Sequence, residues 1–374
     1  MKGAKIVLIA LFCAFIATFG LAMVILPDAE FSENENRYLA KAPEFSAKAL
    51  FSGEFGEKFE TYLADQFPLR EPFVAIKSTA EQLSGKRENN GAYICGDTLL
   101  KRFDEPDMAR VDRNLGYLSD LRDKLDALGI PGYLTVIPSS TDIWAGKLPA
   151  GAPTADQGAI VDYIAENSPL EYIDTRSALI EHADEYIFYR TDHHWTTRGA
   201  YYGYRAAAEA MGFQPIDIDG FEHTTVSDSF YGTTYSSSGV RSVPPDSIET
   251  WVTDDCYEVI RTDENGETAA TLYDKSFLEK KDKYSMFLGG NCPLTVVKNT
   301  INPEGGVLVI VRDSYADSEV PFLAQHFSEI HLIDPRYYKI PAAQYAEQVN
   351  ADAVLISYGL SDFVTTSELL MIGK

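Results

Sequence analysis

The stretch GGVLVIVRDSYADSEVPF, Gly305 to Phe322, joins an uninterrupted apolar run to a polar turn and a second apolar segment. The apolar run has the length and β-branched content of a strand buried on both faces. Ser314 follows this run directly, and a helix is expected around Pro321 to Phe327. A strand that leads straight into a helix is the building unit of α/β folds. The stretch therefore predicts a strand end occupied by Ser314.

The same alternation extends outward along the chain. Further strands are predicted at PGYLTVIP (131–138), LEYIDT (170–175), YIFYR (186–190), SEIHLID (328–334) and ADAVLIS (351–357). Helical periodicity is found at 108–128, with Asp107 as N-cap and Gly129 as stop, at 155–167, at 197–212, with Thr197 as a possible cap, and around 342–349. We therefore expect an α/β fold with a mostly parallel sheet flanked by helices.

Two segments depart from this alternation. Residues from about 221 to 300 are rich in Thr, Ser, Tyr, Asp and Gly, and we expect an irregular or β-rich insertion that borders the site. Residues 28–90 predict a juxtamembrane linker followed by a short helix, in which Phe51, Phe55 and Phe59 recur at helical spacing before QFPLREP. The expected domains are thus 1–27, 28–90 and 91–374.

The run Ile6 to Leu26 is uncharged and apolar, and its length is close to the about 20 residues that a membrane-spanning helix needs. Lys2 and Lys5 precede it, which predicts a cytoplasmic N-terminus and an extracytoplasmic main domain. A cleaved signal peptide is the alternative, but the run exceeds the about 7–15 residues of a signal h-region, and no clear small-residue cleavage site follows it. An uncleaved single-pass anchor is the favoured interpretation.

The charge and cysteine content limit the possible functions. The formal net charge is −24, which argues against nucleic-acid binding through a basic surface. Only three of the four cysteines lie outside the apolar run, so a framework of several disulfides cannot provide the stability. A hydrophobic core must provide it, and the 45% apolar composition supports a globular domain.

Two adjacent histidines occur in FYRTDHHWTTRGAYYGY, Phe188 to Tyr204. If the backbone here is extended, Asp192 and His194 face the same way and His193 points elsewhere. A carboxylate that accepts a hydrogen bond from Nδ1–H of a histidine leaves Nε2 as a base for a third group. The alternative for His194 is a hydrogen-bonded core histidine without chemistry.

Ser314 is the best candidate for the third group. Ligands of open α/β sheets bind beyond the carboxyl ends of the strands, where helix N-termini offer free N–H groups. Ser318 is the main rival in the same segment, and we expect it to lie within the helix. The alternative for Ser314 is an ordinary helix N-cap.

The segments TDHHWTTRGAY, FYGTTYSSSG and VRDSYADS together resemble the DHHW family of anchored bacterial proteins, which is related to SGNH-like proteins that O-acetylate alginate. The resemblance covers most of the chain after the apolar run. It implies that Asp192, His194 and Ser314 form a catalytic triad, and that His193 fills a variable position. It also implies a permuted SGNH-hydrolase-like fold, because the order Asp, His, Ser reverses the usual order.

The resemblance implies further roles. The oxyanion donors of SGNH enzymes match this chain poorly, since only SYGLSDF (357–363) is available near the expected strand end. The Ser314 N–H is the leading donor, and Arg312 and Tyr358 are less certain ones. Aromatic candidates for substrate contacts are Trp195, Tyr231, Tyr235, Trp251 and Tyr315. The implied function is serine-dependent O-acetyl transfer or acetyl-ester hydrolysis on a cell-envelope polysaccharide. A membrane-bound O-acyltransferase would deliver the acetyl groups.

Two other functions remain open at this stage. A metal-dependent phosphoesterase would recruit further ligands such as Asp142, Asp174 or Asp313. A non-catalytic, anchored polysaccharide-binding or assembly protein would retain the fold without turnover. The favoured serine mechanism requires no metal and no cofactor. A polyanionic acceptor would be repelled unless a local basic cleft exists, for which the candidates are Arg190, Arg198, Arg241 and Arg312.

Overall fold

The computed structural model describes residues 2–32 and 37–373. The chain divides into two compact units. The first comprises the residues up to Asn90 together with Ser236–Arg241, and the second comprises Gly91–Tyr235 and the chain from Ser242 onward.

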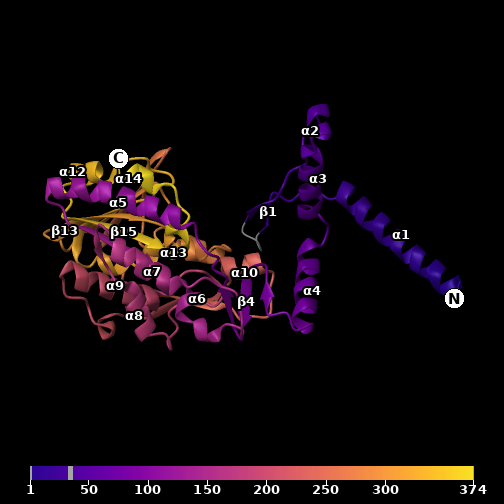
Figure 1. The fold of residues 1–374 in the computed structure, drawn as a ribbon, viewed down its shortest axis with the longest axis horizontal. Coiled ribbons are helices and arrows are strands. Elements are labelled where there is room, and N and C mark those ends of the chain that lie inside the picture. Colours follow the sequence, from indigo (N-terminus) through magenta and orange to yellow (C-terminus); the bar gives the residue numbers. More distant parts are fainter. Residues whose placement is uncertain (1, 33–36, 374) are drawn as a thin grey trace. The chain divides into compact units, whose positions relative to one another are not determined.

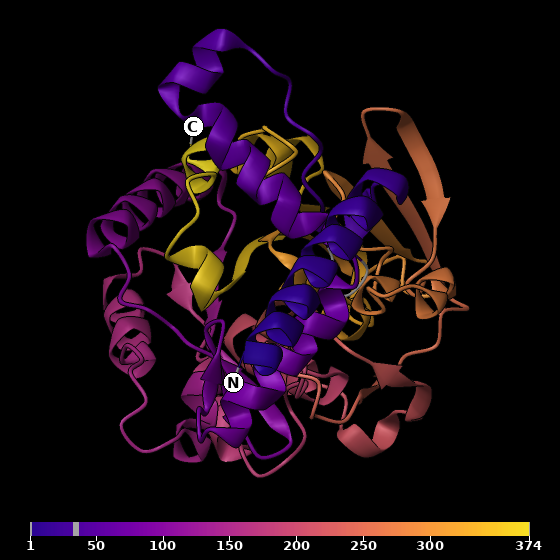
Figure 2. The ribbon, with the colours of Figure 1, turned by 90° about the vertical axis from the view of Figure 1, so that its right-hand side faces the viewer.

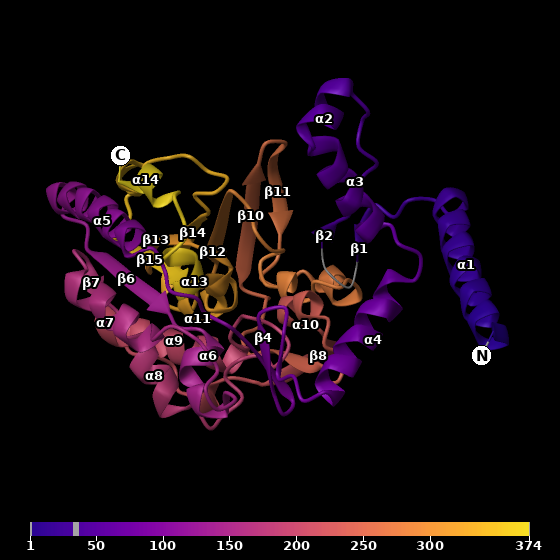
Figure 3. The same cartoon turned by 45° about the vertical axis from the view of Figure 1, so that its right-hand side comes forward.

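A mixed sheet forms the centre of the second unit (Figure 3). Its strand order in the described chain is β11-β10-β12-β14-β13-β15-β6-β7. The strands are β6 (Gly132–Ile137), β7 (Glu171–Tyr172), β10 (Tyr257–Asp263), β11 (Gly266–Ala270), β12 (Leu294–Asn299), β13 (Gly306–Arg312), β14 (Phe327–Ile333) and β15 (Ala353–Gly359). β14, β13, β15, β6 and β7 pair in parallel, whereas β12 joins β14 antiparallel and continues into the β10–β11 hairpin.

Helices cover both faces of this sheet (Figure 1). One core cluster joins the sheet to α5 (Met108–Leu128), α7 (Gln157–Asn167), α12 (Ala342–Gln348) and α14 (Leu369–Ile372). The other joins it to α8 (Thr175–Glu181) and α9 (Thr197–Met211). β13 and β15 contribute to both clusters, for instance through Val309 on one side and Ile310 on the other. Burial on both faces explains their uninterrupted apolar sequences.

Shorter elements complete the second unit. They are β4 (Ala92–Cys95), β5 (Thr98–Lys101), α6 (Ser140–Ile143), η1 (Ala145–Lys147), η2 (Ile218–Gly220), β8 (Thr224–Phe230), β9 (Asp246–Thr250), η3 (Lys275–Glu279), η4 (Tyr284–Met286), η5 (Ser314–Ser318), α11 (Val320–Leu323) and α13 (Leu360–Phe363). α10 (Thr233–Ser238) begins in this unit.

The first unit contains the apolar N-terminal helix. α1 (Lys2–Ile25) is one continuous helix, drawn in indigo from the N label in Figure 2. Among the described residues it is the helix long and apolar enough to cross a membrane, which is consistent with an anchor or a signal sequence. The unit continues with β1 (Phe31–Ser32), β2 (Arg37–Tyr38), α2 (Ala47–Ser52), α3 (Glu54–Asp65), α4 (Arg70–Leu83) and β3 (Glu88–Asn89).

The α/β class is confirmed, but several predicted details were wrong. The sheet is mixed, because β10, β11 and β12 of the predicted insertion extend it as antiparallel strands. The segment 186–190 is a loop with one isolated bridge. α9 is capped by Thr196, one residue before the predicted Thr197, and the helix predicted around 321–327 is reduced to η5 and the short α11.

Candidate active site

The loop that carries Asp192 and His194 is held in a sharp bend before α9. Phe188 forms a bridge with Trp195, and Tyr189 N–H donates to the His194 carbonyl at 3.2 Å. The buried Asp246 accepts hydrogen bonds from the backbone N–H groups of Arg190 and Thr191, at 2.8 and 2.9 Å. These contacts replace strand pairing, which explains why the segment is not extended.

Trp195 connects this loop to the serine segment. Its indole is fully buried against Gly203 of α9, where an added Cβ would come within 2.6 Å of the ring, and its Cβ lies against Gly199, where an added Cβ would come within 2.8 Å. Its Nε1–H donates to the Tyr315 carbonyl at 3.0 Å and to Ser318 Oγ at 2.9 Å. Trp195 is therefore a structural clamp, and its burial excludes the predicted sugar contact.

Asp192, His194 and Ser314 lie in one hydrogen-bonded line. The Asp192 Oδ1 to His194 Nδ1 distance is 2.6 Å, and the His194 Nε2 to Ser314 Oγ distance is 2.7 Å. His194 is 5% exposed and Asp192 2%, whereas Ser314 is half-buried. This is the geometry in which an imidazole takes a proton from a serine hydroxyl while a carboxylate holds its tautomer.

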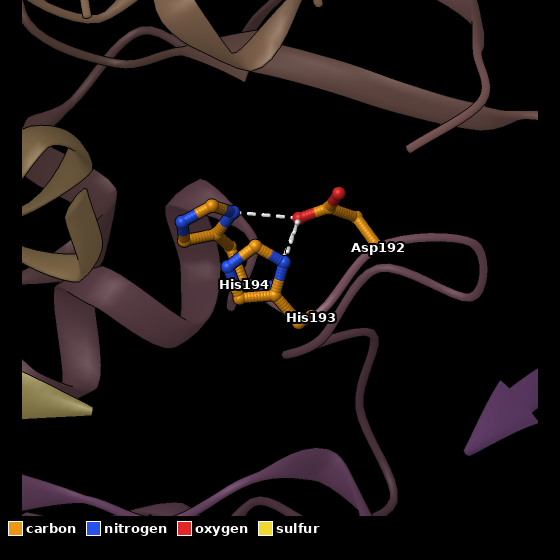
Figure 4. Close-up of side chains that lie close together, drawn as sticks. All are labelled: Asp192, His193 and His194. Atoms are coloured by element: carbon orange, nitrogen blue, oxygen red, sulfur yellow. Dashed lines mark hydrogen bonds and ion pairs between the residues drawn. The ribbon is translucent and has the colours of Figure 1, made fainter. Parts of the chain in front are cut away.

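His193 does not point away from the pair. Its Nδ1 lies 3.5 Å from Asp192 Oδ1, so both imidazoles face the same carboxylate oxygen (Figure 4). The two ring centroids are 3.8 Å apart. The backbone bend explains the difference from the predicted arrangement, because the alternation of side chains holds only for an extended chain.

Asp192 stays ionised although it is buried. Burial acts to raise its pKa, but the His193 and His194 imidazoles and the Thr233 N–H outweigh it and lower the pKa well below its usual value. The N–H and hydroxyl of Thr233 donate to Asp192 Oδ2 at 2.7 and 3.0 Å. Gly232 precedes Thr233, and a Cβ there would collide with the Asp192 carboxylate, so this approach requires glycine.

Ser314 is the first residue of η5, immediately beyond β13. Asp313, not Ser314, is the N-cap: its Oδ1 accepts from Tyr315 N–H at 2.9 Å and its Oδ2 from Gly359 N–H at 2.7 Å. Burial and the nearby Asp362 raise the pKa of Asp313 to about 7. Ser314 thus lies at the carboxyl ends of β13 and β15, which Asp313 joins by its hydrogen bond to Gly359.

Tyr284 also supports the site, although no sequence pattern pointed to it. Its ring stacks on the His194 imidazole with a centroid distance of 3.8 Å and an interplanar angle of 7°. Its hydroxyl donates to the Ser314 carbonyl at 3.0 Å. Tyr284 therefore fixes the plane of the base and the position of the serine together.

The other predicted residues lie in different places. Tyr315 is buried beside the triad, and its hydroxyl donates to the His193 carbonyl. Arg312 is buried and pairs with Asp317 at 3.1 Å. Tyr358 packs in the core cluster that contains α5, and Trp251 is 3% exposed, whereas Tyr231 and Tyr235 are half-buried and stack on each other.

Asp192, His193 and His194 also satisfy the spacing of a metal site, because one ligand atom of each lies within 4.8 Å of the others. Hydrogen bonds account for these atoms, however: His193 Nδ1 contacts Thr233 Oγ1 at 2.7 Å, and both ring nitrogens of His194 lie within the triad. Asp142 pairs with Arg176 at 2.7 Å and Asp174 caps α8. The arrangement is that of a proton relay.

A cavity of about 240 Å³ lies beside the triad at the carboxyl ends of β6 and β15. His193, Tyr315 and Gly359 contribute to its wall, and the exposed Lys101 and Asp362 line it further out. Such a position is where α/β sheets bind their ligands. The cavity is smaller than the about 300–1,000 Å³ of drug-sized sites, so it suits a group of about one ring.

Residues 160–333 match the family described as DHHW protein. This region resembles the DHHW family. The match contains Asp192, His194 and Ser314, and it confirms the predicted relationship.

Several solved structures match the chain. A DHHW family protein from Eubacterium siraeum DSM 15702 is 23% identical, with a TM-score of 0.63, and the match covers 76% of this chain and 95% of that chain. Bacillus cereus PatB1 is 19% identical, with a TM-score of 0.64 and coverages of 75% and 99%. The O-acetyltransferase domain of Pseudomonas putida AlgJ is 15% identical, with a TM-score of 0.44 and coverages of 72% and 91%. No curated protein matches the chain.

Proposed function

We propose that this protein is an extracytoplasmic serine-dependent O-acetyltransferase or acetylesterase that acts on a cell-envelope polysaccharide. The observation that carries the proposal is the continuous line from Asp192 through His194 to Ser314, with hydrogen bonds of 2.6 and 2.7 Å. The resemblance of the DHHW region to proteins that O-acetylate polysaccharides supports the substrate class, and the apolar helix α1 supports the membrane-anchored location.

The reaction has two steps. In the first, Ser314 Oγ forms a bond to the acetyl carbon of the donor, its proton passes to His194 Nε2, and the bond to the leaving group breaks as that group takes the proton. In the second, a sugar hydroxyl or water gives its proton to His194 and attacks the acetyl-serine, and Ser314 Oγ leaves with that proton. Asp192 stabilises the imidazolium that forms in each step.

The developing oxyanion needs hydrogen-bond donors. Ser314 begins η5, so its N–H belongs to the groups that a helix leaves free at its N-terminus, and it is our leading donor. Arg312 stays a less certain candidate: Asp317 and Asn291 bind its Nη1, and the side chain is fully buried.

The acetyl donor and the anchor belong to the same proposal. A single-pass α1 with a cytoplasmic N-terminus would hold the second unit outside the membrane, near a membrane-bound O-acyltransferase that supplies acetyl groups. Whether sugar or water takes the acetyl group distinguishes transferase from esterase, since the first step is common to both.

The test is intact-mass spectrometry of the full-length chain in detergent after incubation with p-nitrophenyl acetate. We expect one acetyl adduct or continuous acetate release, abolished in Ser314→Ala and in His194→Ala. Ser318→Ala is the matched control, because Ser318 lies in the same segment but binds Trp195 instead of His194. An adduct that persists in Ser314→Ala contradicts the triad. Absence of both the adduct and acetate release in the wild type favours an anchored polysaccharide-binding protein.

A further inference from the structure

The second histidine of the motif serves the triad, whereas the first has no function in the proton relay. The His193 side chain is nevertheless fixed in position by its contacts, as the His194 side chain is. Its Nδ1 contacts Thr233 Oγ1 at 2.7 Å, and the ring lies beside the His194 ring. Of its side chain, 39% remains exposed, and His193 lines the cavity of about 240 Å³.

The hydrogen-bond directions fix the tautomer of His193. The ionised Asp192 can only accept, so the Thr233 hydroxyl must donate to it, as its distance of 3.0 Å to Asp192 Oδ2 allows. The Thr233 oxygen can then only accept from His193, which places the proton on His193 Nδ1. Burial and the adjacent His194 lower the pKa of His193, so the ring is neutral and Nε2 carries a lone pair.

That lone pair is available to a ligand. Nδ1 is turned toward Asp192 (Figure 4) and contacts Thr233, so the opposite edge of the ring, with Nε2, remains for the cavity that His193 lines. Within the described residues, Nε2 of His193 makes no hydrogen bond. The neighbouring His194 Nε2 already faces Ser314 Oγ, which makes His194 the base for the reacting hydroxyl.

We propose that His193 Nε2 accepts a hydrogen bond from a second, non-reacting hydroxyl of the acceptor, and so selects acceptors with two adjacent hydroxyls. The inference rests on the proposed function. The ring centroids of His193 and His194 lie 3.8 Å apart, so groups bound at the two rings can belong to neighbouring positions of one acceptor. Water and simple alcohols lack the second hydroxyl, so they bind the cavity without this contact. His193 is thus an acceptor-positioning residue.

Two substitutions of His193 test the roles of Nδ1 and Nε2 separately. In His193→Asn the amide N–H can replace Nδ1–H as the donor to Thr233, but nothing replaces Nε2. In His193→Gln the amide oxygen reaches toward the position of Nε2 and restores an acceptor. His182→Asn is the control, because His182 lies against Tyr202 and Glu185 in a different groove.

The experiment measures acetyl transfer from p-nitrophenyl acetate by the full-length chain to methyl α-D-glucopyranoside and to methanol. The ratio of the two transfer rates removes any general loss of activity. We expect this ratio to fall roughly three- to tenfold in His193→Asn, the loss typical of one neutral hydrogen bond, through a higher KM for the glucoside. His193→Gln should recover most of the ratio, and His182→Asn should keep it. An unchanged ratio in His193→Asn overturns the inference.

Binding to Ser314→Ala tests the same contact without turnover. We expect the Kd of methyl α-D-glucopyranoside to rise about three- to tenfold when His193→Asn is added to Ser314→Ala. If the wild type forms no acetyl-serine but this dependence is found, the proposed function fails and the subsite stands. If the acetyl-serine forms but the glucoside neither binds nor is preferred over methanol, the subsite is overturned and the proposed function stands.

Discussion

The Asp192 carboxylate binds different partners with its two oxygens. Oδ1 faces the histidines, and Oδ2 accepts both hydrogen bonds from Thr233. The Thr233 contacts keep the carboxylate from turning, so Oδ1 stays directed at His194 Nδ1. The base is therefore fixed by a residue 41 positions further along the chain.

Asp192→Asn tests this role of the carboxylate. An amide cannot stabilise the His194 imidazolium, and its N–H₂ group can hold the ring in the wrong tautomer. We expect acylation of Ser314 by p-nitrophenyl acetate to slow by about 10²–10⁴-fold, as in other triads that lose this carboxylate. The burst of p-nitrophenol measures the rate, with the exposed Asp184→Asn as control. Acylation of Asp192→Asn at nearly the wild-type rate would exclude the relay.

Glu319 gives a second test at the scale of one residue. It is buried, its Oε2 has no hydrogen-bond partner among the described residues, and burial raises its pKa to about 8. A raised carboxyl pKa makes the folded state hold its proton longer than the unfolded state. The free energy of unfolding is therefore not reduced by Glu319 at low pH. It declines as the pH rises from about 4.3 to about 8, because Glu319 ionises first in the unfolded state.

Glu319→Gln mimics the protonated form at every pH. We expect it to raise the apparent Tm at about pH 8.5 and to have little effect near pH 4. Thermal denaturation at a fixed scan rate measures the difference, and Glu347→Gln at an exposed position of α12 is the control. An equal gain at both pH values would show that ionisation of Glu319 is not responsible.

The sequence identified some site residues and missed others for a physical reason. Asp192 and His194 are two positions apart, so their pairing follows from local spacing, and Ser314 stands at a recognisable strand end. Thr233, Asp246 and Tyr284 reach the site only through tertiary folding; Thr233 lies in the FYGTTYSSSG segment, but nothing in the local sequence indicates its contact with Asp192 or marks Asp246 and Tyr284. The orientation of His193 was missed because it depends on a bend that long-range hydrogen bonds impose.

At the scale of elements, α9 and the motif loop form one packed unit. Gly199 and Gly203 are four residues apart, so they lie on one face of the helix. Gly199 leaves room for the Ile187 carbonyl and the Trp195 Cβ, and Gly203 leaves room for the Trp195 indole. This packing places Trp195 Nε1 on Tyr315 and Ser318, and thereby joins the base loop to the serine segment. The second glycine of RGAYYG, Gly203, thus provides the space that the aromatic ring of Trp195 occupies.

Gly203→Ala should disturb both segments. Its Cβ would lie 2.6 Å from the indole, which is closer than atoms can pack, so Trp195 must shift. We expect a loss of about 1–3 kcal/mol in unfolding free energy and slower acylation of Ser314. Gly116→Ala in α5 is the control, because nothing lies within 4 Å of its added Cβ. Thermal denaturation and the p-nitrophenol burst measure the two effects. A Gly203→Ala protein as stable and active as Gly116→Ala would contradict the clamp.

The strands were predictable to different degrees. β6, β13 and β15 lie inside the sheet, and burial on both faces leaves an apolar run in the sequence. β10 and β11 form an antiparallel edge with many exposed or half-exposed polar residues, so their sequence resembles an irregular insertion. The segment 186–190 has the composition of a strand, but Asp246 binds the N–H of its last residue, Arg190, and that of the next residue, Thr191.

The charge distribution of the whole molecule bears on the acceptor. The net charge is −24, and a polyanion could approach only through a local basic cleft. The four arginines considered for such a cleft are all paired: Arg190 with Asp97, Arg198 with Glu185, Arg241 with Glu71 and Arg312 with Asp317. Their charges are therefore compensated within the protein. A neutral acceptor fits the molecule better than a polyanionic one.

Salt dependence distinguishes the two kinds of acceptor. Repulsion between a polyanion and this chain should weaken as salt increases from about 0.01 M to about 1 M, since the Debye length falls from about 30 to about 3 Å. We expect acetyl transfer to alginate oligosaccharides to rise severalfold over this range, and transfer to maltooligosaccharides of equal length to stay nearly constant. Both rates are measured with the full-length chain and p-nitrophenyl acetate, and hydrolysis of the same donor serves as the control for salt effects on acylation. If transfer to alginate falls with salt while transfer to the neutral chain does not, a positive surface must attract the acceptor, and the neutral-acceptor interpretation is wrong.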